Sequence, residues 1–188
     1  KRFKGTLIAV PIVNVPAFSN RSRYLPDRRD LNRLFPGSAK GSLGGRLAHV
    51  LTSELLPHCD AVVDLHTGAV NRANLPQIRV SADDDASLDL AEAFGSPVTV
   101  QAPVREGTFR HVCNEANIPV ILYESGEALR LDTASIRFGK RGVQAVMRHL
   151  GMMSKRPAAA KQRAKHAVLS EKGHWERAQV GGLFTSHC

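Results

Sequence analysis

Apolar positions recur along the chain with two different periods: about two residues where a strand is predicted and about 3.6 residues where a helix is predicted. Five short apolar runs rich in β-branched residues predict strands: residues 6–13, 60–66, 77–81, 97–101 and 119–124. Four other segments predict helices: residues 42–56, 83–94, 107–116 and 132–150. Strands that alternate with helices are typical of an α/β sheet with helices on both faces.

Capping residues support the predicted helix ends. Ser42 is a suitable N-cap for the first helix, and Pro57 closes it. The acidic run at residues 83–85 faces the positive end of the next helix dipole. Gly95 ends that helix, and the last one begins at Asp132.

The first forty residues divide into two unlike segments. Residues 6–13 (TLIAVPIV) predict a buried strand. Residues 14–42 are rich in Asn, Pro, Arg, Asp, Gly and Ser, and predict a long irregular stretch. A loop of that length inside a compact domain is usually functional, so this segment is a candidate for substrate contacts.

The net charge of +9 over 188 residues invites a nucleic-acid hypothesis, but its distribution disfavours one. Residues 1–33 hold eight Lys and Arg against two acids, whereas residues 34–150 hold eleven against thirteen. The rest of the excess lies after residue 150, amid Pro157 and an alanine run, where a solvated linker is the simpler interpretation. We therefore expect no nucleic-acid partner.

Composition also bears on the compartment. No apolar run approaches the roughly 20 residues that span a bilayer, and no signal peptide is recognisable, so no membrane partner is expected. The three cysteines, Cys59, Cys113 and Cys188, are widely spaced and odd in number, which is typical of a reducing compartment. The sequence thus predicts a cytoplasmic protein.

Two polar side chains end two predicted buried strands. Alternation places Asp60, Asp64 and His66 on one face of the strand at residues 60–66, and Glu124 ends the strand at 119–124. Ligands of open α/β sheets bind at the carboxyl ends of the strands. His66 either caps its strand or serves a site, and Glu124 is either paired structurally or a general base. Whether the two strands are neighbours stays open.

A third element is the arginine-rich loop at residues 21–33. Arginine offers a planar fork that matches carboxylates and polarised oxyanions. Clustered on one loop, with Asn32 beside Arg33, such side chains suit recognition of a small anionic substrate. A solvated basic loop is the alternative.

Three motifs, in this order and spacing, carry a resemblance. DLNRLFPG (30–37) follows Arg23, and DLHTG (64–68) and YESG (123–126) come later, with NLPQIRV (74–80) between them. Together they resemble the succinylglutamate desuccinylase/aspartoacylase family of zinc carboxypeptidase-like hydrolases. The likeness extends from about residue 5 to residue 184, and any one motif alone would be weak.

The resemblance implies roles for individual residues. His66 would be one zinc ligand, and Glu124 the general base that activates a zinc-bound water and then protonates the leaving amine. Arg23 would polarise the scissile carbonyl. The remaining site residues would bind substrate carboxylates or support the metal ligands: Asn32, Arg33 and Arg110 as substrate contacts, Asp30 and Asp64 as supports.

One family feature is missing from the chain. Members supply the other two zinc ligands from a His-x-x-Glu motif, which occurs nowhere in this sequence. Either the sequence is a fragment of a longer protein, with that motif before Lys1, or it is truncated and catalytically dead. The fragment is the more economical hypothesis, because His66, Glu124 and the arginine loop are intact.

The sequence therefore predicts an α/β fold with a zinc-carboxypeptidase-like mixed sheet flanked by helices. The expected parts are an α/β core at residues 1–151, a basic linker at 152–168 and the start of a small β-domain at 169–188. The expected function is zinc-dependent hydrolysis of the amide bond of a small anionic N-acyl amino acid. The alternatives are a zinc carboxypeptidase and a non-catalytic remnant that binds an acyl amino acid or a partner. A homo-oligomer is also expected if apolar surface is exposed.

Overall fold

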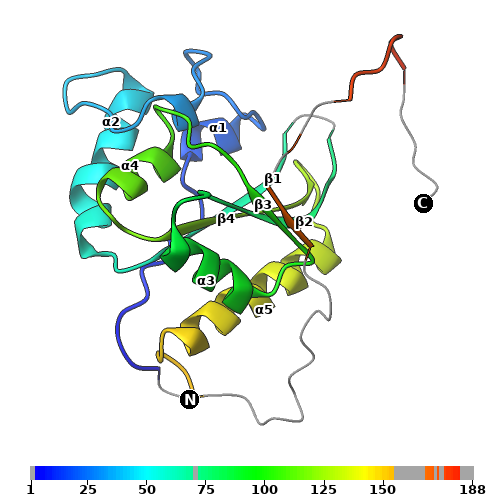
Figure 1. Cartoon of the computed structure of the whole chain (residues 1–188). Coiled ribbons are helices and arrows are strands. Elements are labelled where there is room, and N and C mark those ends of the chain that lie inside the picture. The colour runs from blue at the N-terminus through cyan, green and yellow to red at the C-terminus, as the bar shows by residue number, and fades with distance from the viewer. Residues whose placement is uncertain (1–2, 70–71, 155–167, 172, 174–175, 183–188) are drawn as a thin grey trace.

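The computed structural model describes residues 3–69, 72–154, 168–171, 173 and 176–182. A five-stranded sheet crosses the centre of the molecule in the order β1-β4-β2-β3-β5 (Figure 1). Its strands are β1 Val62–Gly68, β2 Asn74–Val80, β3 Val98–Gln101, β4 Val120–Glu127 and β5 Val168–Ser170. Strand β4 is parallel to β1 and antiparallel to β2, while β2 and β3 are parallel. The predicted α/β fold with a mixed sheet is confirmed.

Helices cover both faces of the sheet, as Figure 1 shows. On one side lie α3 (Asp85–Phe94) and α5 (Thr133–His149), and on the other α1 (Val15–Ser19), α2 (Leu43–Val50) and α4 (Phe109–Glu115). Helix α2 continues through a π-helical turn, Leu51–Leu55, and a 3-10 turn, Leu56–His58. The four predicted helices are therefore present, with ends shifted by a few residues.

Alternate residues of the strands belong to two separate cores. On the α3 and α5 face, the buried residues are Ile78, Val80, Leu90, Ala91, Phe94, Ile121, Tyr123 and Val146. On the α2 and α4 face, they are Leu25, Leu31, Phe35, Ala48, Leu51, Leu56, Val112, Cys113 and Val120. The period of two along a strand thus divides its side chains between the two layers.

The predicted capping residues act as expected. Ser42 Oγ accepts from the Gly45 N–H at 3.2 Å, and the Asp132 carboxylate accepts from the N–H groups of Ala134 and Ser135. The Asp84 side chain caps α3, and Gly95 ends that helix at a φ of 78°. A left-handed residue of this kind favours glycine, so the helix boundaries were readable from the sequence.

The strand predicted at residues 6–13 is wrong. The segment is not a strand, and its apolar side chains Leu7, Ile8 and Val10 are exposed. Apolar β-branched residues favour a strand only where a neighbouring strand pairs with them, and no described strand pairs with this segment. Residues 14–42 are also less irregular than predicted, because they include α1 and a 3-10 turn at Leu31–Arg33.

Strand β5 lies where the sequence predicts a separate β-domain. Its residues Val168–Ser170 pair with β3 in the main sheet. Residues 155–167, most of the predicted linker, lie outside the described residues, so the division into core, linker and β-domain stays a prediction. In the part of the chain that the structure describes, no helix has the length and apolar composition to cross a bilayer.

Burial should make the Cys113 thiol unreactive. Burial first, and then the nearby negative charges of Asp64 and Cys59, raise the pKa of this thiol to about 12. The thiolate is the reactive form, so iodoacetamide at pH 8 should modify Cys113 only after unfolding in guanidinium chloride. Half-buried Cys59 is the internal comparison and should be modified first. Mass spectrometry of the alkylated peptides measures both, and rapid labelling of Cys113 in the folded chain would contradict the prediction.

Candidate active site

His66 and Glu124 lie beside one another on neighbouring strands. Strands β1 and β4 are adjacent and parallel, and their register pairs His66 with Glu124. Paired residues point to the same side of a sheet, so both side chains lie on the face covered by α2 and α4. The question that the sequence leaves open is thereby answered: the two strands are neighbours, and their carboxyl ends bring His66 and Glu124 side by side.

His66 is surrounded by negative charge. Its Nε2 donates to Oδ2 of Asp64 at 2.8 Å. Burial alone would lower the pKa of His66, but the carboxylates of Asp64 and Glu124 outweigh it, and the net pKa is raised. Positive charge at Arg23 opposes this increase, which places Arg23 near the same imidazole. The surroundings of His66 therefore favour a bound cation, whether a proton or a metal ion.

Glu124 is held by two residues of β2. The amide nitrogen Nδ2 of Asn74 donates to Oε2 of Glu124. Nε of Arg79 lies 3.7 Å from Oε1, and the Glu124 side chain is only 18% exposed. Sequence reasoning missed both partners. The available signal was the polar positions of residues 77–81, which alternate with the buried residues Ile78 and Val80.

Arg23 is fixed by Asp30 within the N-terminal loop. Nε and Nη2 of Arg23 donate to Oδ2 of Asp30 at 3.1 and 2.9 Å. Oδ1 of the same carboxylate accepts from the Asn32 N–H at 3.0 Å and caps the 3-10 turn. Asp30 thus orients Arg23 in this structure, and its predicted contact with a zinc histidine stays a prediction.

The predicted substrate-binding residues lie in two places. Oδ1 of Asn32 accepts from the Phe109 N–H at 2.9 Å, which ties the loop to the start of α4. Arg33 is exposed, and its Nη1 donates to the Asn32 carbonyl oxygen. Arg110 of α4 lies near Arg79: burial first, and then the charge of Arg79, lower its pKa. The described contacts thus bring Arg110 to the β2 side of the site.

The described residues do not complete a zinc site. Among residues 3–69, 72–154 and the short described segments after them, no three His, Cys, Asp or Glu side chains are placed to hold a metal ion. His66 supplies one imidazole, which fits the predicted role of a single ligand. Three protein ligands are the usual requirement of a catalytic zinc site, so the donor set is incomplete within these residues.

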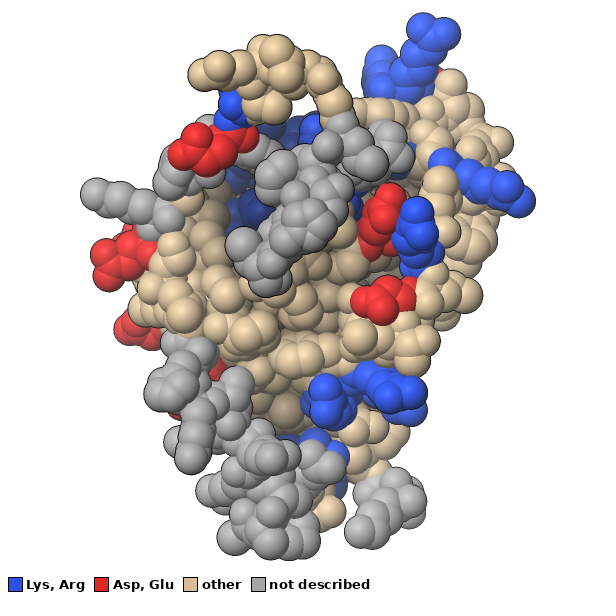
Figure 2. All heavy atoms as spheres, turned by 90° about the vertical axis from the view of Figure 1, so that its right-hand side faces the viewer, with Lys and Arg blue, Asp and Glu red and all other residues tan. Residues whose placement is uncertain are grey.

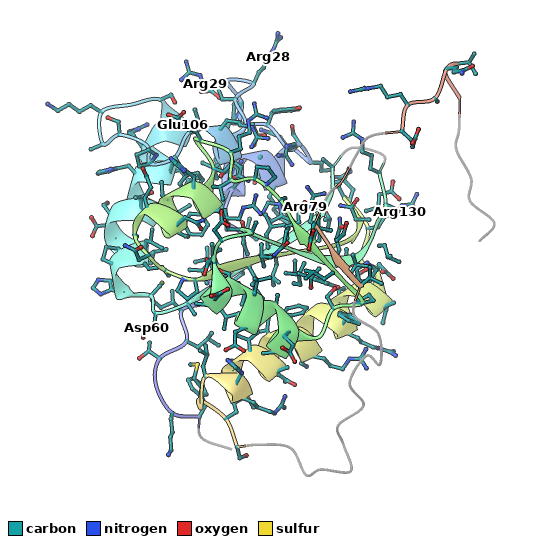
Figure 3. All side chains as sticks on the ribbon, in the orientation of Figure 1. Arg28, Arg29, Asp60, Arg79, Glu106 and Arg130 are labelled. Atoms are coloured by element: carbon teal, nitrogen blue, oxygen red, sulfur yellow. The ribbon has the colours of Figure 1, made fainter. Side chains whose placement is uncertain are left out.

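Basic side chains lie both in a hollow of the surface and at the outer edge of the N-terminal loop. Figure 2 shows Lys and Arg atoms recessed in a hollow in the upper part of the molecule. In Figure 3, Arg79 lies centrally above the sheet, whereas Arg28 and Arg29 lie at the outer edge of the loop. Arg79 is only partly exposed and lies beside the carboxylate of Glu124, and a charged pair of this kind is typical of a site for a polar ligand.

Comparisons with known proteins bear on this geometry. Residues 1–150 match the succinylglutamate desuccinylase/aspartoacylase catalytic domain. The N-alpha-acetyl-L-2,4-diaminobutyric acid deacetylase of Halomonas elongata is 30% identical over 158 residues, which are 80% of this chain and 46% of that protein. The chain thus spans about half the length of this curated relative.

Comparison with solved structures indicates the same family. The succinylglutamate desuccinylase/aspartoacylase of Rhodobacter sphaeroides is 33% identical with a TM-score of 0.75, over 85% of this chain and 49% of that one. The product-bound ectoine utilization protein EutE (DoeB) of Ruegeria pomeroyi is 26% identical with a TM-score of 0.75, over 86% and 50%. The fold therefore follows that of these proteins.

Proposed function

Because the chain belongs to the succinylglutamate desuccinylase/aspartoacylase family, we propose that it is the substrate-handling part of a deacylase. The reaction is hydrolysis of the amide bond of a small N-acyl amino acid to a carboxylate and a free amine. The observation that carries the proposal is the pairing of His66 with Glu124 on β1 and β4, with Arg23 nearby. In this proposal the base Glu124, the cation Arg23 and the imidazole of His66 act on the same amide bond.

The residues divide the chemistry between them. Glu124 takes a proton from the attacking water and returns it to the leaving amine. Asn74 and Arg79 hold its carboxylate in place from β2. Arg23, oriented by Asp30, stabilises the negative charge that develops on the carbonyl oxygen. Each of these roles uses a charge or a hydrogen bond that the folded chain already provides.

His66 is the proposed ligand of a zinc ion. The family is zinc-dependent, and the Asp64 and Glu124 carboxylates around His66 favour a cation. A bound zinc ion supplies Lewis-acid chemistry to the amide carbonyl and to water. Among the residues that the structure describes, no group of three His, Cys, Asp or Glu side chains is placed to complete such a site.

Two observations support the proposed substrate class: the positive charge of the arginines in the site and the names of the related proteins. Three arginines of the site, Arg23, Arg79 and Arg110, suit a substrate that carries a carboxylate. Relatives are named for N-acetyl-diaminobutyrate deacetylation and for succinylglutamate or aspartate deacylation. An N-acyl amino acid with a free carboxylate is the structure these substrates share.

A substrate panel tests the proposal. The protein that carries this chain should bind about one zinc ion and release amine from one of three substrates: N-acetyl-2,4-diaminobutyrate, N-acetylaspartate or N-succinylglutamate. Elemental analysis measures the metal, a ninhydrin-type assay measures the amine, and a chelator should stop the release. Bound zinc without hydrolysis of any N-acyl amino acid would refute a deacylase.

A second candidate is a non-catalytic binding protein, and it is considered because the described residues hold one predicted zinc ligand, His66, and no group of three metal-binding side chains. The same arginines would then hold an acyl amino acid that is never cleaved. This candidate predicts neither stoichiometric zinc nor amine release, together with saturable binding of an N-acyl amino acid by calorimetry. The substrate panel therefore separates the two candidates.

A further inference from the structure

Helices α3 and α5 together form one outer face of the molecule, called here the α3–α5 face. The two helices lie side by side on the same side of the sheet (Figure 1). They run in opposite directions, because Asp89 of α3 contacts His149 of α5 at 2.8 Å, whereas Phe94 at the end of α3 lies against Gly142. The first residues of the two helices therefore lie at opposite ends of this face.

The start of α3 forms an acidic end of the α3–α5 face. Asp83, Asp85 and Asp89 are exposed there, and among the described residues only Asp89 has a cationic partner, His149. The last turn of α5 also carries Arg148 at this end, and its side chain is half-buried. Two exposed carboxylates, those of Asp83 and Asp85, therefore have no neutralising partner within the described part of the chain.

The first half of α5 forms a basic end of the same face. Arg137, Lys140 and Arg141 are exposed there, and the guanidinium of Arg141 lies 5.7 Å from the ring centroid of Phe138. The carboxylate at this end is that of Asp132, which caps α5 by accepting from two backbone N–H groups. None of the three basic side chains forms an ion pair with a carboxylate among the described residues. Their positive charge is therefore available to a partner.

The spacing of the two ends suits contact with a second copy of the chain. With a helical rise of about 1.5 Å per residue, and Asp89 level with His149, Asp85 and Lys140 lie roughly 20 Å apart along the face. A standard protein interface covers about 800 Å² of each partner and is of comparable width. Between the ends, the exposed Ala86 and the half-buried Gln144 carry no charge that would oppose close approach.

We propose that two copies of this chain associate through the α3–α5 face, with the acidic end of each on the basic end of the other. A two-fold axis in the interface, midway between the ends, forms this contact twice. A nucleic acid or another polyanion would use the basic end alone and would be repelled by the acidic end. A second copy satisfies both ends at once. The inference goes beyond the proposed function and does not depend on it, because none of the proposed site residues lies on α3 or α5.

Complementary charge reversals test the interface. The protein that carries this chain should sediment as a dimer. The first variant is Arg137→Glu with Arg141→Glu, and the second is Asp83→Lys with Asp85→Lys. Each variant places like charges opposite one another at both contacts, so the dissociation constant of its homodimer should rise at least about tenfold. An equimolar mixture of the two variants should restore the dimer, because every contact between the unlike copies then joins opposite charges. Sedimentation velocity measures all three samples.

The matched control carries the same change of net charge on the other side of the sheet. Lys40→Glu with Arg46→Glu alters two exposed residues at and before α2 and should leave the dimer intact. If the lysine variant does not fold, Asp83→Asn with Asp85→Asn replaces it and should associate better with the first variant than with itself. A wild-type protein that is monomeric at about 100 μM, a dimer unaffected by either reversal, or a mixture that fails to dimerise would each overturn the inference.

Discussion

Replacing Glu124 with glutamine should lower kcat for amide hydrolysis by about 100- to 10,000-fold. Glutamine keeps the shape of the side chain and can still accept from Nδ2 of Asn74, but it cannot take a proton from water. Substrate affinity should change much less, because Arg23 and Arg110 are untouched. The measurement is a steady-state assay of amine release, with substrate binding followed by calorimetry.

The control for this variant lies on the same strand. Glu127 of β4 is paired with Arg130 at 2.8 Å and is not assigned to the site, so Glu127→Gln should retain activity. Zinc content and the melting temperature should be similar in the two variants. If Glu124→Gln retains more than about a tenth of the wild-type rate, general-base catalysis by this residue is wrong.

Replacing Gly142 with valine should destabilise the fold by about 2–3 kcal/mol. Gly142 of α5 faces Phe94 of α3, and a Cβ atom at residue 142 would lie 2.3 Å from two ring carbons of Phe94. The ring is 4% exposed and lies 5.0 Å from that of Tyr123, measured between centroids, so it has little room to move. The two helices would have to separate, and the core beneath the sheet would be disrupted.

Thermal unfolding checks this expectation. The melting temperature should fall by about 4–12 °C for a chain of this size. Lys140→Val on the exposed side of the same helix places the same β-branched residue in solvent and should change the melting temperature much less. Helix propensity favours valine over glycine but not over lysine, so a melting temperature in Gly142→Val no lower than in Lys140→Val would show that the contact with Phe94 does not determine the result.

Local signals were sufficient to predict most of the fold. Ser42, Asp84 and Asp132 cap helices because their side-chain oxygens reach N–H groups within the next three residues. The information for such a contact lies within one helical turn of sequence. The apolar run at residues 6–13 lacked a comparable local constraint, since a strand depends on a partner elsewhere in the chain.

The candidate site was predictable in part for the same reason. His66 and Glu124 were found because each ends an apolar strand, which is visible in the sequence alone. The contact between Asn74 and Glu124 joins residues 50 positions apart and depends on the antiparallel register of β2 and β4. Periodicity reveals which face a residue occupies, but neither the order of strands in the sheet nor their direction. The contact of Arg79 with Glu124 was missed because it depends on both the order and the direction of β2 and β4.

Because β2 runs antiparallel to β4, the edge of the sheet that carries the candidate site is formed by the last residues of two strands and the first residues of a third. Strands β1 and β4 reach this edge with their last residues, whereas β2 reaches it with its first, so Asn74 of β2 lies beside Gly126 of β4. The strand that carries the proposed base therefore lies between β1, which carries the proposed metal ligand, and β2, which carries the two partners of that base. A substitution of Asn74 or Arg79 in β2 should therefore disturb the carboxylate of Glu124 while leaving His66 on β1 in place.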